Sequence, residues 1–164
     1  MGKTLLAAKD PEGVGLAAPQ VGKLLQIFIT KPSPKSPIQV FINPVITLNS
    51  ADPNADKRPK TTQRKSASRS AKISDSSKKL EGCLSLPNIW GEVNRPPIIT
   101  LFYLDRNGGI HTKTFKGLFS TIIQHEIDHL NGILFPKRVL EQKGTLYKSH
   151  KDEKGEDVFE EIEL

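Results

Sequence analysis

The chain of 164 residues contains a single cysteine, and it has no long apolar run. One cysteine cannot form an internal disulfide, which excludes a small secreted fold stapled by disulfides. No apolar stretch approaches the roughly 20 residues that a membrane-spanning helix needs, and the start lacks the charged, hydrophobic and small-residue order of a signal peptide. We therefore expect a cytoplasmic chain that does not enter a membrane.

The net charge of +6 is concentrated in one part of the chain. Residues 50–79 are rich in Ser, Lys and Arg, show no apolar periodicity, and hold nine basic residues against three Asp. The difference between these two counts, +6, equals the charge of the whole chain, so the remainder is neutral. We expect one domain over residues 1–164, interrupted by a disordered basic insertion at 50–79.

Short stretches of apolar and β-branched residues, separated by turn residues, predict an α+β fold with antiparallel strands. A helix is expected to end near Lys9, and a hairpin is expected around Asn107-Gly108-Gly109. The expected strands are 25–30, 39–42, 45–48, 98–104 and 110–115, with a terminal hairpin of 144–149 and 157–164.

The most informative stretch is His125-Glu126-Ile127-Asp128-His129. Apolar residues recur at helical spacing from Gly117 to Asn131, and Gly132 follows where a glycine would end a helix. Residues four apart lie on the same face of a helix, so His125 and His129 can bind one cation while Glu126 flanks it. The strands are therefore expected to pack around a central helix that carries this metal motif.

A catalytic metal site usually takes three protein ligands, so a third donor is needed. The metzincin pattern requires a histidine where this chain has Phe135, and Glu141 lies too close for a thermolysin-like site. Cys83, in the sequence Glu81-Gly82-Cys83-Leu84-Ser85, is the remaining candidate. A lone cysteine is most often an inert core residue, so its position alone leaves both interpretations open.

Three motifs together resemble the signature motifs of peptide deformylases, in the order in which that family has them. The motifs are residues 13–22 (GVGLAAPQVG), 81–87 (EGCLSLP) and 124–132 (QHEIDHLNG). The likeness also takes in Asn43-Pro44 and the stretch from Val93 to Arg95. It implies a single catalytic domain that removes the formyl group from the N-terminal formyl-methionine of new polypeptides.

The resemblance also implies roles for individual residues. Cys83, His125 and His129 would hold one divalent ion with an open position for water, and Glu126 would carry protons between that water and the leaving amine. The family pattern assigns stabilisation of the oxyanion to the side-chain amide of Gln20 and the backbone N–H of Leu84.

The segment Gly13-Val14-Gly15 is expected to bind the main chain of an extended substrate, because glycines allow close approach. Asp128 is expected to orient a neighbouring group, with Arg95 as its candidate partner and a solvated helix charge as the alternative.

Ferrous iron is the native ion that the resemblance implies, with zinc as the alternative. The expected partners are N-formyl-methionyl nascent peptides, together with a weak contact of the insertion at 50–79 with ribosomal RNA, because phosphates require only positive charge. The chain departs from the family in this insertion, in a start close to the end of the first helix, and in an acidic tail, 151–164. The alternatives to an active deformylase are a binding relative that has lost catalysis and, more distantly, a zincin protease.

Overall fold

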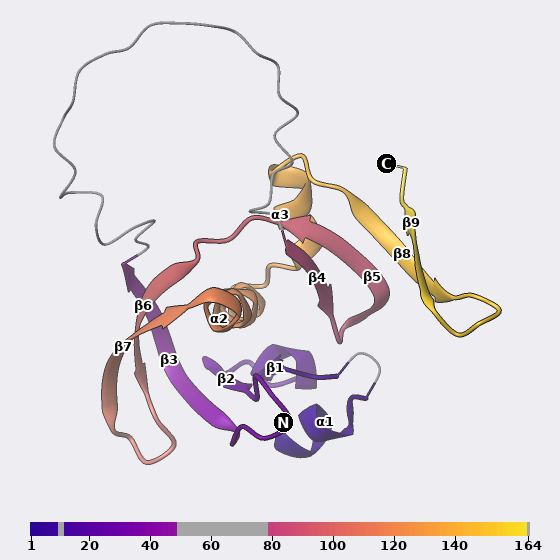
Figure 1. Ribbon diagram of the computed structural model, residues 1–164. Coiled ribbons are helices and arrows are strands. Elements are labelled where there is room, and N and C mark those ends of the chain that lie inside the picture. Colours follow the sequence, from indigo (N-terminus) through magenta and orange to yellow (C-terminus); the bar gives the residue numbers. More distant parts are fainter. Residues whose placement is uncertain (10–11, 49–78, 164) are drawn as a thin grey trace, which may run out of the picture.

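A computed structural model of the chain describes residues 1–9, 12–48 and 79–163. It is an α+β fold of antiparallel sheets with few helices, so the predicted class is confirmed (Figure 1). The elements in chain order are α1 (Gly2–Ala7), β1 (Gly15–Ala17), the 3-10 helix η1 (Ala18–Val21), β2 (Ile27–Thr30), β3 (Gln39–Leu48), β4 (Lys79–Cys83), β5 (Leu86–Val93), β6 (Ile98–Leu104), β7 (Ile110–Lys116), α2 (Gly117–Leu130), α3 (Phe135–Glu141), β8 (Leu146–Lys151) and β9 (Asp157–Glu161).

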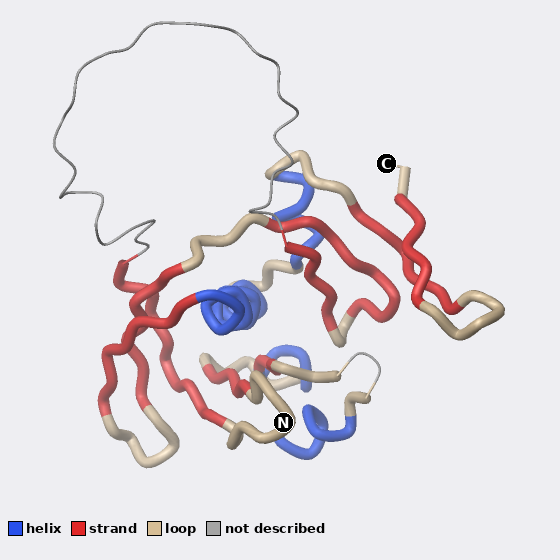
Figure 2. The backbone as a smooth tube through the Cα atoms, viewed as in Figure 1, coloured by secondary structure: helices blue, strands red, loops and turns tan. Residues whose placement is uncertain are grey.

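The strands form two sheets that lie on different sides of α2. One sheet has the order β1-β2-β3-β6-β7, and the other has the order β4-β5-β8-β9. Figure 2 shows α2 nearly end-on, with the larger sheet curving past it on one side and β4 and β5 on the other. Side chains of α2 can therefore meet residues from both sheets, which is the arrangement that a site between the sheets requires.

Aromatic rings fix α2 to the larger sheet. The rings of Phe28 and Phe41 stack with centroids 4.6 Å apart. Tyr103 of β6, the strand on the other side of β3, has its ring centroid 4.6 Å from that of Phe41. Ile123 of α2 is fully buried in this cluster, beside Leu101. Because interlocking side chains of this kind resist displacement, the helix has one defined position over the sheet.

The sequence places the ends of α2 as predicted. Gly117 begins the helix directly after β7 with a φ of 60°, and its N–H donates to the Pro97 carbonyl over 2.8 Å. At the other end, Gly132 has a φ of 71°, and the N–H of Ile133 donates to the carbonyl of Asp128 over 2.8 Å. This pattern is a Schellman motif, so Gly132 is the helix-ending glycine that the sequence indicated.

Two expected strands, 39–42 and 45–48, are one strand, β3. Asn43 adopts a φ of 49°, and the pairing with β6 shifts between Ile42 and Val45. Pro44 has no N–H to donate to β6, so the pairing is interrupted there. The interruption is a bulge, and the strand continues beyond it.

The expected hairpins are present. β6 pairs with β7, and β8 pairs with β9 across a turn in which Gly155 has a φ of 80°. The predicted insertion at 50–79 lies outside the described residues except for Lys79, which begins β4. Within residues 1–9, 12–48 and 79–163, no helix has both the length and the apolar character to cross a bilayer.

Candidate metal centre and its pocket

Three donor side chains meet between the two sheets. His125 and His129 come from α2, and Cys83 comes from the end of β4. One ligand atom from each residue lies within 4.8 Å of the others, and the Cys83 sulfur lies 3.1 Å from Nε2 of His129. The structure therefore brings together the three residues that the sequence singled out, although Cys83 lies more than 40 residues before the two histidines in the chain.

Strand β4 turns Cys83 and Glu81 to the same side. Glu81 and Cys83 are buried, whereas Leu80 is exposed and Gly82 between them is half-buried. The pairing with β5 shifts after Gly82, where Cys83 faces Leu86 across the turn. Side chains two residues apart on a strand point to the same face, so the carboxylate of Glu81 lies on the same side as the sulfur of Cys83.

The carboxylate of Glu81 forms a hydrogen bond with one ring nitrogen of His125. Its Oε2 lies 3.1 Å from Nδ1 of that ring. A carboxylate accepts hydrogen bonds, so Nδ1 carries a proton, and Nε2 is the nitrogen left for a second partner. Support of this kind is what a metal-binding imidazole requires.

Arg95 ties this carboxylate to α2. Its guanidinium donates to both oxygens of Glu81, over 2.6 and 2.9 Å, and to Oδ2 of Asp128 over 2.9 Å. Asp128 also accepts from Arg138 of α3, over 2.7 and 3.2 Å. The expected pairing of Asp128 with Arg95 is confirmed, and the solvated alternative is wrong, because Asp128 is 5% exposed.

The electrostatics favour a thiolate at Cys83. Burial opposes its ionisation, but hydrogen bonds with His125 and His129 outweigh that effect and lower the pKa of the Cys83 thiol to about 5. Burial would also lower the pKa of His125, but its hydrogen bonds with Cys83 and Glu81 raise that pKa to about 10. The pocket therefore favours positive charge next to the sulfur, and a metal cation could take the place of that proton.

Glu126 is a buried carboxyl beside this cluster. It is 4% exposed, and among the described residues nothing donates a hydrogen bond to its Oε2. Burial, together with the negative charges of Cys83 and Glu81, raises the pKa of Glu126 to about 8, although His125 and Arg95 oppose the shift. A carboxyl with a pKa near neutrality can both accept and give a proton.

Gln20 presents its amide NH₂ to the sulfur. The N–H of Ala17 donates to Oε1 of Gln20 over 2.8 Å, which fixes the orientation of the amide. Nε2 then lies 3.6 Å from the Cys83 sulfur and 3.0 Å from Oγ of Ser85. A hydrogen-bond donor is therefore held at the edge of the cluster, on the side of η1.

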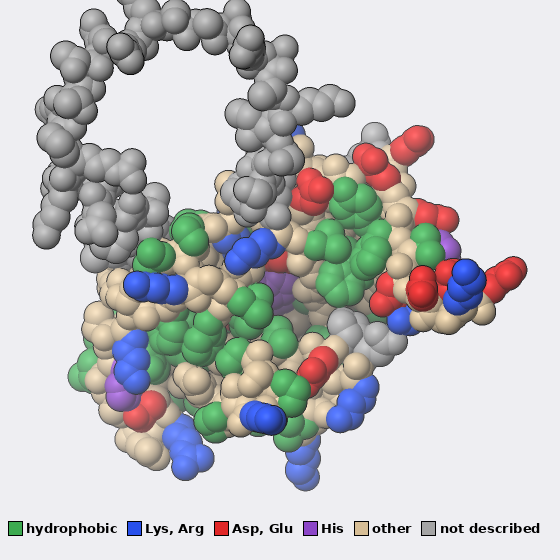
Figure 3. Space-filling model, in the orientation of Figure 1, with side chains coloured by type: hydrophobic (Ala, Val, Ile, Leu, Met, Phe, Trp, Pro, Cys, Tyr) green, Lys and Arg blue, Asp and Glu red, His purple; other side chains and the backbone are tan. Residues whose placement is uncertain are grey.

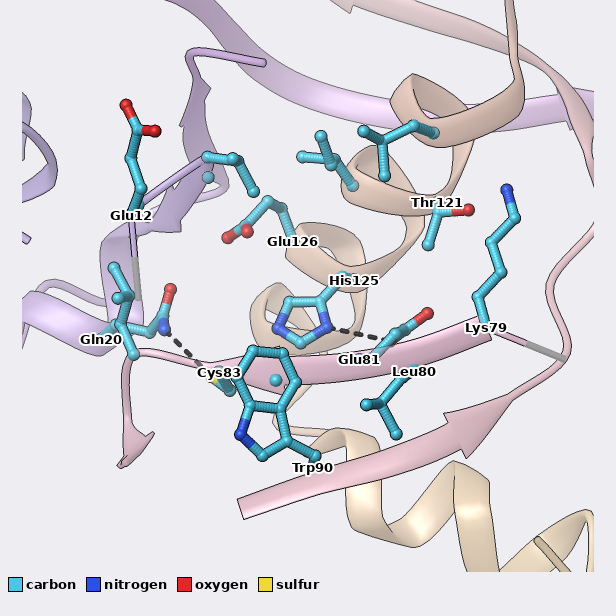
Figure 4. Close-up of a pocket in the computed structure, with 17 residues that line it drawn as sticks. Glu12, Gln20, Lys79, Leu80, Glu81, Cys83, Trp90, Thr121, His125 and Glu126 are labelled. Atoms are coloured by element: carbon cyan, nitrogen blue, oxygen red, sulfur yellow. Dashed lines mark hydrogen bonds and ion pairs between the residues drawn. The ribbon is translucent and has the colours of Figure 1, made fainter. Parts of the chain in front are cut away.

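A pocket opens over these groups. Figure 4 shows His125, Glu126 and Gln20 pointing into it from α2 and from the segment after β1. In Figure 3 a histidine side chain is visible in a hollow near the middle of the face, between hydrophobic side chains. Of the predicted residues, His129 is not part of the lining, which includes Gly13, Val14, Gly15, Gln20, Cys83, Leu84, His125 and Glu126.

Two of the glycines in this lining, Gly13 and Gly15, lie close to other side chains of the protein. A Cβ on Gly15 would strike the carboxylate of Glu126, and one on Gly13 would come within 2.8 Å of Leu5. Close approach of the protein's own side chains therefore requires glycine at both positions. Binding of substrate by Gly13, Val14 and Gly15 remains a prediction.

Sequence reasoning missed two residues of the site. Glu81 and Trp90 both line the pocket, and neither was expected to act there. Glu81 could have been found from its spacing, since it precedes Cys83 by two positions on a strand. Trp90 could have been considered because it is the one tryptophan of the chain and follows the cysteine motif closely in the sequence.

The sequence model of the polypeptide deformylase family matches residues 1–144. The chain belongs to this family. The peptide deformylase of Rhizobium meliloti (strain 1021) is 40% identical over 129 residues, which are 77% of this chain and 61% of that protein. The peptide deformylase of Treponema pallidum (strain Nichols) is 37% identical over 131 residues, 80% of this chain and 65% of that protein. The chain thus spans less than two thirds of the length of these deformylases.

Solved deformylase structures have a similar fold. The peptide deformylase of Synechococcus elongatus in complex with actinonin superposes with a TM-score of 0.60 at 36% identity, covering 78% of this chain and 57% of that one. The Met-Ala-Ser-bound class I type b peptide deformylase of Acinetobacter baumannii gives a TM-score of 0.61 at 33% identity, covering 85% and 76%.

Replacing Arg95 with Met should strongly destabilise this member of the deformylase family. The change leaves Glu81 and Asp128 as buried, unpaired carboxylates, which typically costs about 3 to 5 kcal/mol of unfolding free energy. Urea unfolding measures the loss. Lys137→Met is the matched control, because the pair of Lys137 with Glu141 is exposed, and its removal should cost no more than about 0.5 kcal/mol. Equal losses in the two variants would contradict the importance of the buried network.

Proposed function

We propose that this chain is a metal-dependent amide hydrolase that removes the formyl group from the N-terminal formyl-methionine of new polypeptides and releases formate. The observation that carries the proposal is the convergence of Cys83, His125 and His129 beside the buried carboxylate of Glu126. Membership of the polypeptide deformylase family supports the same reaction. Residues 1–164 would form one catalytic domain, with α2 as the central helix that carries the metal motif.

The donor set suits a divalent transition metal. A thiolate and two imidazoles are ligands that zinc and ferrous iron accept, and the contact of Glu81 with Nδ1 leaves Nε2 of His125 for the ion. Such an ion would supply Lewis acidity, lowering the pKa of water and stabilising negative charge on a carbonyl oxygen. We infer Fe²⁺ as the native ion and Zn²⁺ as the alternative from the family resemblance. A reducing cytoplasm would protect the thiolate.

An extended peptide fits along β1. This strand is at the edge of its sheet, with β2 as its neighbour in the sheet order, and its first residue, Gly15, lines the pocket together with Gly13 and Val14. Main-chain hydrogen bonds from Gly13, Val14 and Gly15 would add the substrate as a further strand. The methionine side chain would enter between apolar residues of the lining, among them Val14, Leu118 and Ile122.

Glu126 has the properties of a proton carrier. Among the described residues nothing donates to its Oε2, so in its ionised form the carboxyl could take a proton from the attacking water, and its raised pKa would favour return of that proton to the leaving amine. The carboxylate is also held against Gly15, next to the strand that would bind the substrate. Proton transfer would thus take place beside the scissile formyl group.

Gln20 and Leu84 would stabilise the oxyanion. Nε2 of Gln20 already faces the cluster, because Ala17 holds the opposite end of its amide. The backbone N–H of Leu84 follows Cys83 directly in the turn after β4. Each such donor typically lowers the barrier by about 3 to 4 kcal/mol.

The other two functions fit less well. A relative that only binds formyl peptides has no need of a buried carboxyl that can exchange protons, which is what Glu126 provides. A zincin protease would take its third ligand from downstream of the helix, whereas here the donor beside the two histidines is Cys83 of β4. Release of formate from a formyl-methionyl peptide, without cleavage of internal peptide bonds, separates the three.

Glu126→Gln should keep the metal and lose the reaction. The residue is proposed as a proton carrier and not as a ligand, so metal stoichiometry should stay near that of the wild type while turnover falls by roughly 10²-fold or more. Formate release and metal content are measured on the same anaerobically purified sample. Unchanged turnover would sink this assignment.

Cys83→Ala should lose both metal and activity. It removes one of three proposed donors, whereas a buried cysteine without that role would tolerate alanine at a cost of about 1 kcal/mol. Ser85→Ala is the control for metal content, since it removes a hydroxyl that bonds to Gln20 and leaves the three proposed donors intact. Full metal occupancy in Cys83→Ala would refute the Cys/His/His site.

We also propose that the basic segment at 50–79 makes a weak contact with ribosomal RNA. The support is its charge of +6, nine basic residues against three acidic. Replacing residues 50–78 with a short Gly/Ser linker should weaken association with ribosomes and reduce its salt dependence, while formate release from a free peptide persists. An unchanged salt dependence of ribosome binding would argue against the contact.

A further inference from the structure

The one tryptophan of the chain forms a wall of the pocket. Trp90 lies on β5 opposite Gly82 of β4, and both residues line the pocket (Figure 4). The indole packs directly on the glycine backbone, because a Cβ on Gly82 would come within 2.9 Å of Cε3 and Cζ3 of the ring. The ring therefore covers the strand segment that leads into Cys83.

Two side chains of the C-terminal hairpin hold this indole. Its Nε1–H donates to Oγ of Ser149 over 3.0 Å. Phe159 meets the ring edge to face, with centroids 5.8 Å apart and planes at 78°. Ser149 and Phe159 are cross-strand partners in the β8–β9 pairing, so one pair of hairpin residues contacts both the polar and the apolar part of the indole.

The hairpin is itself fixed to the body of the protein. Leu146 is buried with Phe135 and Val139, and Ile162 packs against the same cluster. The N–H of Ile162 donates to the carbonyl of Leu146 over 2.8 Å. Ser149 and Phe159 belong to the stretch after residue 144, where the match to the deformylase family ends.

We propose that the β8–β9 hairpin is a positioning element of the peptide pocket. Through Ser149 and Phe159 it holds Trp90 as a flat apolar wall, and this wall favours peptides with an aromatic or large aliphatic residue directly after methionine. The inference rests on the proposed function for its substrate. The formyl group would lie at the buried donors, whereas Trp90 is half-buried, so the ring would meet a later residue of the peptide.

The test compares two substrates that differ in the residue after methionine. Formate release is measured from a formyl-Met-Phe-Ser peptide and from a formyl-Met-Gly-Ser peptide. In Phe159→Ala the preference for the aromatic peptide, as a ratio of kcat/KM values, should fall roughly 3- to 10-fold, the range typical of one aromatic contact. The change should lie in KM for the aromatic peptide, with kcat for the glycine peptide retained.

Two variants of the same strand serve as controls. Phe159→Tyr keeps the ring and should keep the wild-type preference. Val158→Ala shortens the neighbouring side chain, which points to the other face of the sheet, and should also keep it. Loss of the preference in Val158→Ala as well as in Phe159→Ala would indicate general damage to the hairpin and overturn the inference.

Fluorescence of Trp90 gives a readout that does not depend on catalysis. The chain has no other tryptophan, so its emission reports on this indole alone. Phe159→Ala should shift the emission to longer wavelength, increase quenching by acrylamide, and diminish the spectral change on titration with Met-Phe-Ser. Ser149→Ala should do the same to a smaller degree, and it carries the test if Phe159→Ala does not fold.

The outcomes separate this inference from the proposed function. Absence of formate release by the wild type would contradict the proposed function, while the Met-Phe-Ser titration would still decide whether the hairpin controls Trp90. An active enzyme whose substrate preference and Trp90 emission are unchanged in Phe159→Ala and Ser149→Ala would overturn the inference alone.

Discussion

The guanidinium of Arg95 is the contact on which the geometry of the site depends. It binds Glu81 of β4 and Asp128 of α2, and so joins the smaller sheet to the helix. Buried ions are costly unless paired, so these carboxylates have low free energy only when strand and helix are in register around the cation. In that register Glu81 also reaches His125, and Cys83, two residues along the strand, meets the histidines.

The same constraint extends to α3, which contacts both α2 and the smaller sheet. Arg138 of α3 adds a second cation to Asp128, and its helix packs on β5 through Val139. The position of α3 is thus tied electrostatically to α2 and by apolar contact to the smaller sheet. A displacement of any one element would break an ion pair or open the apolar cluster, and the donor side chains would separate.

The sequence predicted those parts whose signal is local. The periodicity of Ile122, Ile123 and Ile127, with Gly132 after them, is enough to define α2, and Asn107-Gly108-Gly109 is enough to define a hairpin. Elements whose signal is weak were not predicted. β4 alternates Glu81 and Cys83 on its buried face, so it lacks the apolar alternation of a strand, and α3 has only seven residues with Pro136 near its start.

Contacts between distant segments were predictable only in part. The two histidines were accessible from their spacing on a helix, Cys83 was assigned as the third donor through the family resemblance, and Arg95 was the candidate partner of Asp128, with a solvated charge as the alternative. The contact of Glu81 with His125 and the contacts of Ser149 and Phe159 with Trp90 depend on strand register. A single sequence does not specify that register for strands joined through long connections. Register also explains the packing of Gly15 on Glu126, because β1 meets α2 at a point fixed by β2 and the aromatic cluster.

Charge balance links the site to its proposed ion. Glu81, Asp128, Glu126 and the thiolate of Cys83 lie close together, and Arg95 with Arg138 offsets two of these negative charges. The remaining excess of negative charge helps to raise the pKa values of Glu126 and His125. Both groups retain protons that an isolated carboxyl or imidazole would release at neutral pH. A divalent cation held by Cys83, His125 and His129 would remove that surplus. It would also lower the proton affinity of Glu126, so binding of the ion and readiness of the proton carrier would be coupled through one electrostatic balance.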